Sequence, residues 1–249
     1  MTETPQRTGG VDLAAGAPGT ALAVVAWSPG RARLESLELN ADDERVVTAT
    51  ADLDLLGIDC AFGWPDEFVD FVAAHAAGDA TPDGGIDWRR TLAYRETDRA
   101  VHAAIGRWPL SVSADRLGLT AMRCAGLLAR LAAGGVRVDG SAEEGRVAEV
   151  YPGATLRLWG WDVRGYRVDV DVRRRLLARL AAEAPWLELG DHPELMTRSC
   201  DAFDAVIAAL SARAALLRHY ARPSAAQVDR ARREGWVVLP TGPLADLVS

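Results

Sequence analysis

The segment 55–65 most constrains the fold of this chain, because a short apolar run there delivers a single carboxylate. The run Leu-Leu-Gly-Ile precedes Asp59, and Gly63 and Pro65 then end it. This pattern predicts a buried strand with an acid at its carboxyl end. Because burying an unpaired carboxylate is costly, we expect Asp59 to face a cleft or a cation.

Other acids occupy comparable positions. Asp12 lies in the short predicted strand 11–14, Glu149 lies in the predicted strand 147–150, and Asp201 and Asp204 open an apolar helix. The two helix acids are three residues apart in the sequence and therefore share a helix face. Since parallel strands of an open α/β sheet end at one crevice, we expect all of these acids to converge there.

Converging carboxylates predict a site for a divalent cation, because Mg²⁺ and Mn²⁺ prefer oxygen ligands and retain water. Two such ions about 4 Å apart can activate water and stabilise a leaving oxygen in phosphodiester cleavage. We expect Asp12, Asp59, Glu149 and Asp201 to bind the metal, and Asp204 to join these four in catalysis. Taken singly, each acid is equally well explained as a turn cap, a helix N-terminal residue or an arginine partner.

Two arginines and one further acid are candidates for contacts with a substrate. Arg95 and Asp98 belong to a compact polar group, and Arg123 interrupts the apolar face of a predicted helix. Because guanidinium groups bind phosphate bidentately, we expect Arg95 and Arg123 to hold a phosphate and Asp98 to orient an arginine or a water. The alternatives are surface ion pairs within residues 95–99 and a solvent-reaching side chain at Arg123.

The order of the predicted elements indicates a mixed α/β fold. Strands at 11–14, 20–27 and 31–39 form an antiparallel meander, and a helix ending near residue 51 leads into the strand that carries Asp59. A helical crossover of this kind places the Asp59 strand parallel to the first one. The length of 249 residues and the 49% hydrophobic composition favour one domain over the whole chain.

Helices are predicted for much of the remaining sequence. We expect a helical insertion at about 65–145, in which a long polar stretch at 78–91 forms a loop over the site. Further helices are expected at 169–184 and 201–217, followed by a C-terminal helical extension over 220–249. Within this extension we expect a short strand at 235–240.

Composition excludes several classes of protein. All 28 basic residues are arginine and the net charge is -7, which argues against indiscriminate coating of nucleic acid. No apolar run reaches the about 20 residues of a membrane span, and the first residues lack the apolar core of a signal peptide. We therefore expect a cytoplasmic protein without membrane contact. The cysteines and histidines show no ligand spacing, which argues against a zinc site.

An ordered set of motifs resembles the domain of unknown function 429 family, which is described as predicted nucleases of ribonuclease-H fold. The motifs are Asp12, Gly57-Ile58-Asp59 with Gly63-Trp64-Pro65, Arg95-x-Thr97-Asp98, Thr120-Ala121-x-Arg123, Glu149-x-Tyr151-Pro152, Asp201-Ala202-x-Asp204-Ala205 and Glu234-Gly235-Trp236. The resemblance covers nearly the whole chain. It implies a ribonuclease-H-like α/β fold whose central mixed five-stranded sheet is flanked by helices, with acids gathered at its centre.

One functional hypothesis and two alternatives follow. The first is a metal-dependent phosphodiesterase or nuclease that acts on nucleic acid through carboxylate-bound Mg²⁺ or Mn²⁺. An alternative from another class is a non-catalytic ribonuclease-H-like module that binds a nucleotide or a protein partner in its cleft. The third, an actin-like sugar kinase or ATPase, normally contains two copies of the unit, whereas this sequence indicates one.

Overall fold

The computed structural model describes residues 5–79 and 82–248, and its centre is a seven-stranded mixed sheet. The strands are β1 (Gln6–Asp12), β2 (Ala21–Ser28), β3 (Arg31–Leu39), β4 (Leu55–Asp59), β5 (Val147–Val150), β6 (Leu187–Glu188) and β7 (Val237–Val238). Their order in the sheet is β6-β3-β2-β1-β4-β5-β7. The mixed sheet is confirmed, but the prediction of five strands is wrong, because β6 and β7 add an edge strand on each side. β6 was not predicted, because its two residues are too few to produce the alternation that identifies a strand in a sequence.

The predicted meander and its parallel neighbour are confirmed, but the first strand was predicted at 11–14 and spans Gln6–Asp12. β2 pairs antiparallel with β1 and with β3, and β4 pairs parallel with β1. Side chains alternate along β2, so that Ala23, Val25 and Trp27 join the core on one face of the sheet and Leu22 joins the core on the other. β5 and β7 continue the parallel half, so β1, β4, β5 and β7 all end at the same edge.

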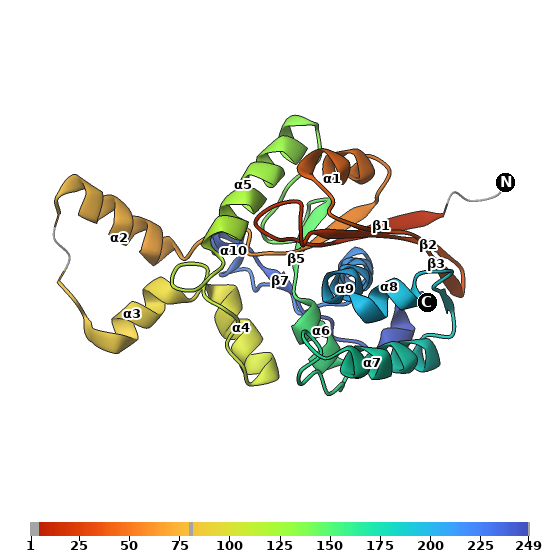
Figure 1. Cartoon of the computed structure of the whole chain (residues 1–249). Helices are drawn as coiled ribbons and strands as arrows, with labels where there is room; N and C mark the ends of the chain where they lie inside the picture. The colour runs from red at the N-terminus through yellow and green to blue at the C-terminus, as the bar shows by residue number, and fades with distance from the viewer. Residues whose placement is uncertain (1–4, 80–81, 249) are drawn as a thin grey trace.

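Helices cover both faces of the sheet (Figure 1). α1 (Asp43–Thr50) and α5 (Gly118–Ala133) lie on one face, and on the other lie α6 (Pro152–Leu158), α7 (Val170–Glu183), α8 (Pro193–Arg198) and α9 (Cys200–Leu216). The remaining helices are α2 (Asp66–Ala77), α3 (Gly85–Ala93), α4 (Glu96–Ile105), α10 (Val228–Glu234) and the 3₁₀ helix η1 (Leu244–Val248). None of the described helices is both long and apolar enough to cross a membrane.

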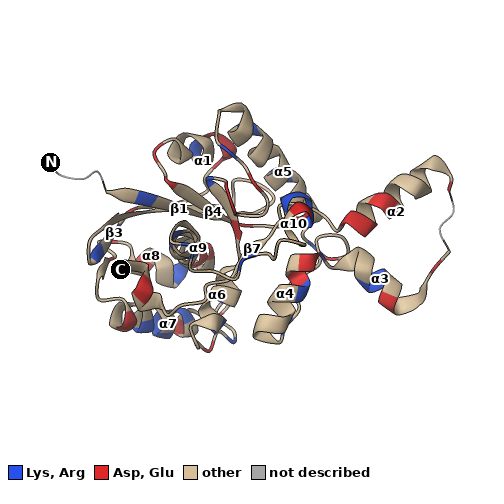
Figure 2. Cartoon of the chain, turned by 180° about the vertical axis from the view of Figure 1, so that it is seen from behind, with Lys and Arg blue, Asp and Glu red and all other residues tan. Residues whose placement is uncertain are grey.

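The stretch between β4 and β5 contains α2 to α5, and the pair α2 and α3 projects from the body of the molecule (Figure 1, Figure 2). Residues 85–91, which were predicted to belong to a loop over the site, are part of α3 in this projecting pair. They are helical because Trp88 packs edge-on against Phe71 of α2, with ring centroids 5.7 Å apart. Residues 80 and 81 of the predicted loop lie outside the described part of the chain.

The C-terminal stretch contains the short strand predicted at 235–240, which the structure places at Val237–Val238. It supplies the edge strand β7 as well as α10 and η1, so it is joined to the sheet by hydrogen bonds to β5. Whether the whole chain forms one domain stays a prediction.

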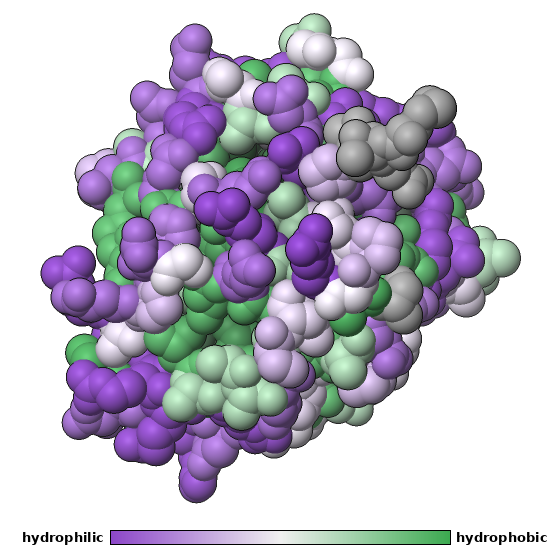
Figure 3. All heavy atoms as spheres, turned by 90° about the vertical axis from the view of Figure 1, so that its right-hand side faces the viewer, coloured by the Kyte–Doolittle hydropathy of each residue, from purple (hydrophilic) through white to green (hydrophobic). Residues whose placement is uncertain are grey.

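Figure 3 shows the end of the molecule at which β1 begins. Hydrophobic residues lie between hydrophilic ones on that face. Asp12 and Asp59 are the last residues of β1 and β4. The predicted acids therefore belong to the opposite end of these strands.

α9 packs against β1 and is buried on every side. Its residues 202–215 are all buried, and many of them are alanine. A glycine in β1 permits the close approach, since a Cβ at Gly10 would lie only 2.1 Å from the carbonyl oxygen of Ala205. This packing brings the N-terminal part of α9, which carries Asp201 and Asp204, into electrostatic range of the end of β1.

Replacing Gly10 with alanine is therefore expected to lower the free energy of unfolding by about 3 kcal/mol, because the added methyl group would force β1 away from the backbone of α9. Gly126→Ala in α5 is the matched control. A Cβ at Gly126 meets nothing within 4 Å, so this change should stabilise the protein by about 0.5–1 kcal/mol. Urea denaturation followed by circular dichroism measures both changes, and equal midpoints would contradict the packing described here.

Candidate functional site

The ends of β1 and β4 place two acids side by side. Asp12 lies directly opposite Asp59 in the parallel register. Asp201 and Asp204, near the N-terminus of α9, lie within electrostatic range of Asp12. Glu149 lies on the neighbouring strand β5. The structure thus brings together the five acids that the sequence singled out.

A cavity of about 210 Å³ opens at these strand ends. Its polar lining consists of four acids and two arginines, together with a threonine and a tyrosine: Asp12, Asp59, Asp98, Glu149, Arg95, Arg167, Thr120 and Tyr151. Most of its other lining residues are apolar, among them Leu13, Leu110 and Leu117. An apolar cavity with a few convergent polar groups is typical of a small-molecule or substrate site.

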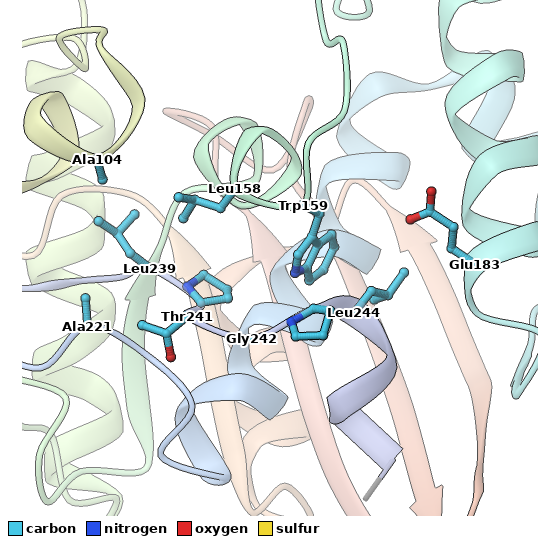
Figure 4. Close-up of a pocket in the computed structure, with 11 residues that line it drawn as sticks. Ala104, Leu158, Trp159, Glu183, Ala221, Leu239, Thr241, Gly242 and Leu244 are labelled. Atoms are coloured by element: carbon cyan, nitrogen blue, oxygen red, sulfur yellow. The ribbon is translucent and has the colours of Figure 1, made fainter.

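A larger hollow of about 480 Å³ has a different character (Figure 4). It shares no lining residue with the acidic cavity, and Leu158, Trp159 and Leu239 form much of its wall. Among its lining residues only Glu183 carries a charge, and this carboxylate pairs with Arg179. The acidic cavity is therefore the candidate site.

The carboxylates of Asp12 and Asp59 are poorly solvated and are repelled by neighbouring carboxylates. Burial, followed by repulsion from Asp59, Asp204 and Asp201, raises the pKa of Asp12 to about 9. Burial and then the charge of Asp204 likewise raise the pKa of Asp59 well above its usual range. No hydrogen bond from a described residue reaches the carboxylate of Asp12 or Asp59. An added positive charge at this position would therefore be strongly favoured.

Asp204 is held more firmly than the two strand acids. Its side chain is 1% exposed, and the hydroxyl of Tyr166 donates to both of its oxygens at 3.0 Å. The thiol of Cys200 donates to Oδ2, and the guanidinium of Arg167 lies 3.9 Å away. Burial raises the pKa of Asp204 to about 6, while Arg167 and Tyr166 oppose that rise. Asp201 is half-buried, and burial raises its pKa too.

Glu149 is not a free carboxylate, because Arg95 neutralises it. Arg95 Nη2 donates to Glu149 Oε1 at 2.7 Å, Nη1 donates to Oε2 at 2.9 Å, and Phe62 N–H donates to Oε2 at 3.0 Å. The same guanidinium donates through Nε and Nη2 to Asp98, and through Nη1 to the Glu234 carbonyl. With all five N–H groups engaged, Arg95 has no donor left for a phosphate.

Two residues at the C-terminal end of α10, Glu234 and Gly235, explain why this buried network forms. Gly235 has φ of +90°, and a Cβ there would lie 2.3 Å from Glu149 Oε2. Only glycine fits such a position without strain. Glu234 accepts the backbone N–H of Asp66 and of Glu96, so one carboxylate holds the starts of α2 and α4. The motif Glu234-Gly235 therefore supports the site from outside the cavity, by contacts with Glu149, Arg95 and the starts of α2 and α4.

Arg123 lies outside the lining of the cavity. Its Nε donates to Asp43 at 2.8 Å, and its Nη1 donates to the Ala14 carbonyl and to the Thr20 hydroxyl. Where a phosphate was expected, the structure gives Arg123 a carboxylate partner, which belongs to the start of α1. Arg123 thus fixes the loop that follows Asp12.

The chemistry of the donors fits a hard divalent cation, although the acids do not form a ready cage. Among the described residues, no three histidine, cysteine or acidic side chains lie close enough to hold a metal ion together. Mg²⁺ needs no such cage, since it keeps several waters and takes one or two carboxylates plus substrate phosphate. Asp12 and Asp59 suit the role of cation ligands, because their carboxylates accept no hydrogen bond from a described residue.

Three residues near the acids were not predicted from the sequence. Arg167 and Tyr151 line the cavity, and Tyr166 binds Asp204. Arg167 and Tyr166 belong to the turn before α7, between Gly165 and Asp169. Neither Arg167 nor Tyr166 lies on a periodic apolar face. Their only sequence signal is a turn between two helices that combines glycine, arginine and tyrosine.

A family model described as "Protein of unknown function (DUF429)" matches residues 10–227. This match confirms the resemblance that the motifs indicated. No curated protein and no solved structure matches the chain.

Proposed function

Because the chain belongs to the DUF429 family, whose function is unknown, we propose an activity from its own residues: metal-dependent hydrolysis of phosphodiester bonds in nucleic acid. The observation that carries the proposal is the pair Asp12 and Asp59. They lie opposite each other at adjacent strand ends and line one cavity, and no described residue donates a hydrogen bond to either carboxylate. Repulsion and burial make this pair costly unless a cation accompanies it.

A ribonuclease-H-like fold is part of the same proposal. Within the seven-stranded sheet, the five longer strands follow the order β3-β2-β1-β4-β5, with an antiparallel meander joined to parallel strands. The acids lie at the ends of the central strands and on the helix packed beneath them. This arrangement supports the proposed fold, whose activity must still be argued from the site.

Each side chain has a role in the proposal. Bound Mg²⁺ or Mn²⁺ would polarise a phosphoryl oxygen and lower the pKa of a water. Asp12 and Asp59 would hold the ion, and the half-buried Asp201 would accept hydrogen bonds from its waters. Asp204, kept in place by Tyr166, would maintain the negative field that attracts the cation. Glu149, Arg95 and Asp98 enter as positioning residues, because their side chains already bind one another in two ion pairs.

A nucleotide-binding module remains the second candidate. It is favoured by one observation, that no three acidic, histidine or cysteine side chains of the described residues already converge on a common point. A module of this kind would bind a nucleotide in the cavity of about 210 Å³ without cleaving it.

Cleavage assays separate the two candidates. The purified protein is incubated with labelled single-stranded DNA, single-stranded RNA, an RNA–DNA hybrid and a branched DNA, in Mn²⁺, in Mg²⁺ and in EDTA. We expect products from at least one substrate with a divalent cation and none in EDTA, and the activity should follow the protein through a size-exclusion column. Binding without any product in either metal would favour the module.

A further inference from the structure

A further hollow, of about 440 Å³ and distinct from the one in Figure 4, adjoins the acidic cavity. The two share Leu110, Tyr151 and Arg167 in their linings, so one leads into the other. This hollow lies between the loop that follows α4, the helix α6 and the turn that precedes α7. We call it the arginine groove after the four residues Arg107, Arg157, Arg164 and Arg167 that line it.

The charge of the arginine groove is positive. No aspartate or glutamate is among its lining residues, although the whole chain carries a net charge of -7. Arg164 forms an ion pair with Asp162 at 2.7 Å, and Arg167 reaches Asp204 at 3.9 Å. Within the described residues, no carboxylate lies within ion-pair distance of Arg107 or Arg157, so two guanidinium groups are available to an anion.

The wall that carries Arg107 is rigid. The next residue, Trp108, stacks on His102 with ring centroids 4.2 Å apart and an interplanar angle of 11°, and its ring lies 4.3 Å from that of Tyr94. Such aromatic packing holds the loop after α4 in place without help from a ligand. The groove is therefore formed before any substrate arrives, which lowers the entropic cost of binding.

The groove also offers apolar contacts at its rim. Leu110, in the loop after α4, is 49% exposed. Val168, in the turn before α7, is 87% exposed. A base-paired duplex presents mainly phosphates at its surface, whereas a single strand also offers unstacked bases to such side chains. The combination of unpaired arginines and exposed apolar residues matches a single strand.

From these observations we propose that the arginine groove binds the phosphates of a single-stranded nucleic acid on one side of the bond at the acidic cavity. This inference rests on the proposed function and deepens it, because it names the substrate class. Arg107 and Arg157 contact the flanking phosphates, and Arg167 lies where the groove meets the acids. A small phosphodiester would fill only the acidic cavity and would leave these arginines unused.

Fluorescence anisotropy tests the groove without requiring catalysis. The probes are labelled oligothymidylate and oligouridylate of about 12 nucleotides and a duplex of the same length, all in EDTA. We expect Arg107→Gln with Arg157→Gln to weaken single-strand binding at least about tenfold, and to reduce the salt slope of log K by about 1.4 for two lost phosphate contacts. Arg174→Gln with Arg175→Gln on the exposed face of α7 removes the same charge and should leave both values nearly unchanged.

The outcomes separate this inference from the proposed function. If the wild type binds single strands in EDTA through these arginines but cleaves nothing with Mn²⁺, the groove stands and the hydrolytic proposal fails. If the wild type cleaves substrates but the groove variant binds and cleaves them as well as the α7 variant does, the groove is overturned and hydrolysis stands. Preference for the duplex over both single strands also overturns the inference.

Discussion

Replacing Asp59 with asparagine is expected to stabilise the metal-free protein at about pH 8 and, at the same time, to remove its hydrolytic activity. Asp59 is an acid whose pKa is raised by burial and by the charge of Asp204. The isosteric amide removes this repulsion, and we expect a gain of about 2 kcal/mol in the free energy of unfolding, or about 4–8 °C in Tm. Loss of one of two proposed cation ligands should lower the cleavage rate at least about 10³-fold.

The pH dependence of stability follows from the sign of these shifts. The pKa of Asp12 is about 9 in the folded protein and about 4 in an unfolded chain, so between these values the folded state binds more protons. The stability contributed by the neutral form is complete below about pH 4 and is lost as the pH rises towards about 9. In EDTA the wild type should therefore lose stability over this range, and Asp59→Asn should lose less.

Thermal unfolding in EDTA and in Mn²⁺ measures this prediction. Mn²⁺ should raise the Tm of the wild type at about pH 8, because a ligand that binds only the folded state stabilises it, and should have little effect on Asp59→Asn. Asp191→Asn, at an exposed acid before α8, is the control and should behave as the wild type does. An Asp59→Asn variant that is less stable and still active would contradict both the electrostatics and the site.

Much of the central sheet could be predicted because its signals are local. The apolar run before Asp59 ends at glycine and proline, and the strands of the meander alternate or are rich in β-branched residues. The edge strand β6 carries no such signal, since two residues cannot display a period. α3 was missed because none of its residues is buried and it is held by one ring contact, between Trp88 and Phe71, which no local pattern reveals.

The acids of the site could be predicted, but their partners could not. Strand ends on one sheet edge must lie close together, which sufficed to group Asp12, Asp59 and Glu149. The sequence does not reveal which arginine neutralises which acid, because Arg95 meets Glu149 across 54 residues. Arg95 was expected to bind phosphate, yet it is buried in ion pairs, whereas Arg167 reaches the acids from a turn without any periodic pattern.

Replacing Arg95 with methionine is expected to lower the free energy of unfolding by about 3–5 kcal/mol, because it leaves two buried carboxylates without a positively charged partner. The side chains of Glu149 and Asp98 are 3% and 1% exposed, so water cannot replace the five lost hydrogen bonds. Urea denaturation measures the loss. Arg7→Met is the matched control, since it breaks an exposed pair with Glu35 and should cost no more than about 1 kcal/mol.

A second variant and a pH series identify the cause of that loss. Without Arg95, the pKa of the buried Glu149 should rise further above its usual range, so its neutral form stabilises the folded state at low pH and this stability is lost as the pH rises. The deficit of Arg95→Met should therefore be smaller at about pH 5 than at about pH 8. Adding Glu149→Gln to Arg95→Met should recover part of the stability, because one unpaired charge becomes neutral. A deficit that is equal at both pH values and unchanged in the double variant would mean that Arg95 acts through packing of its alkyl chain and not through charge.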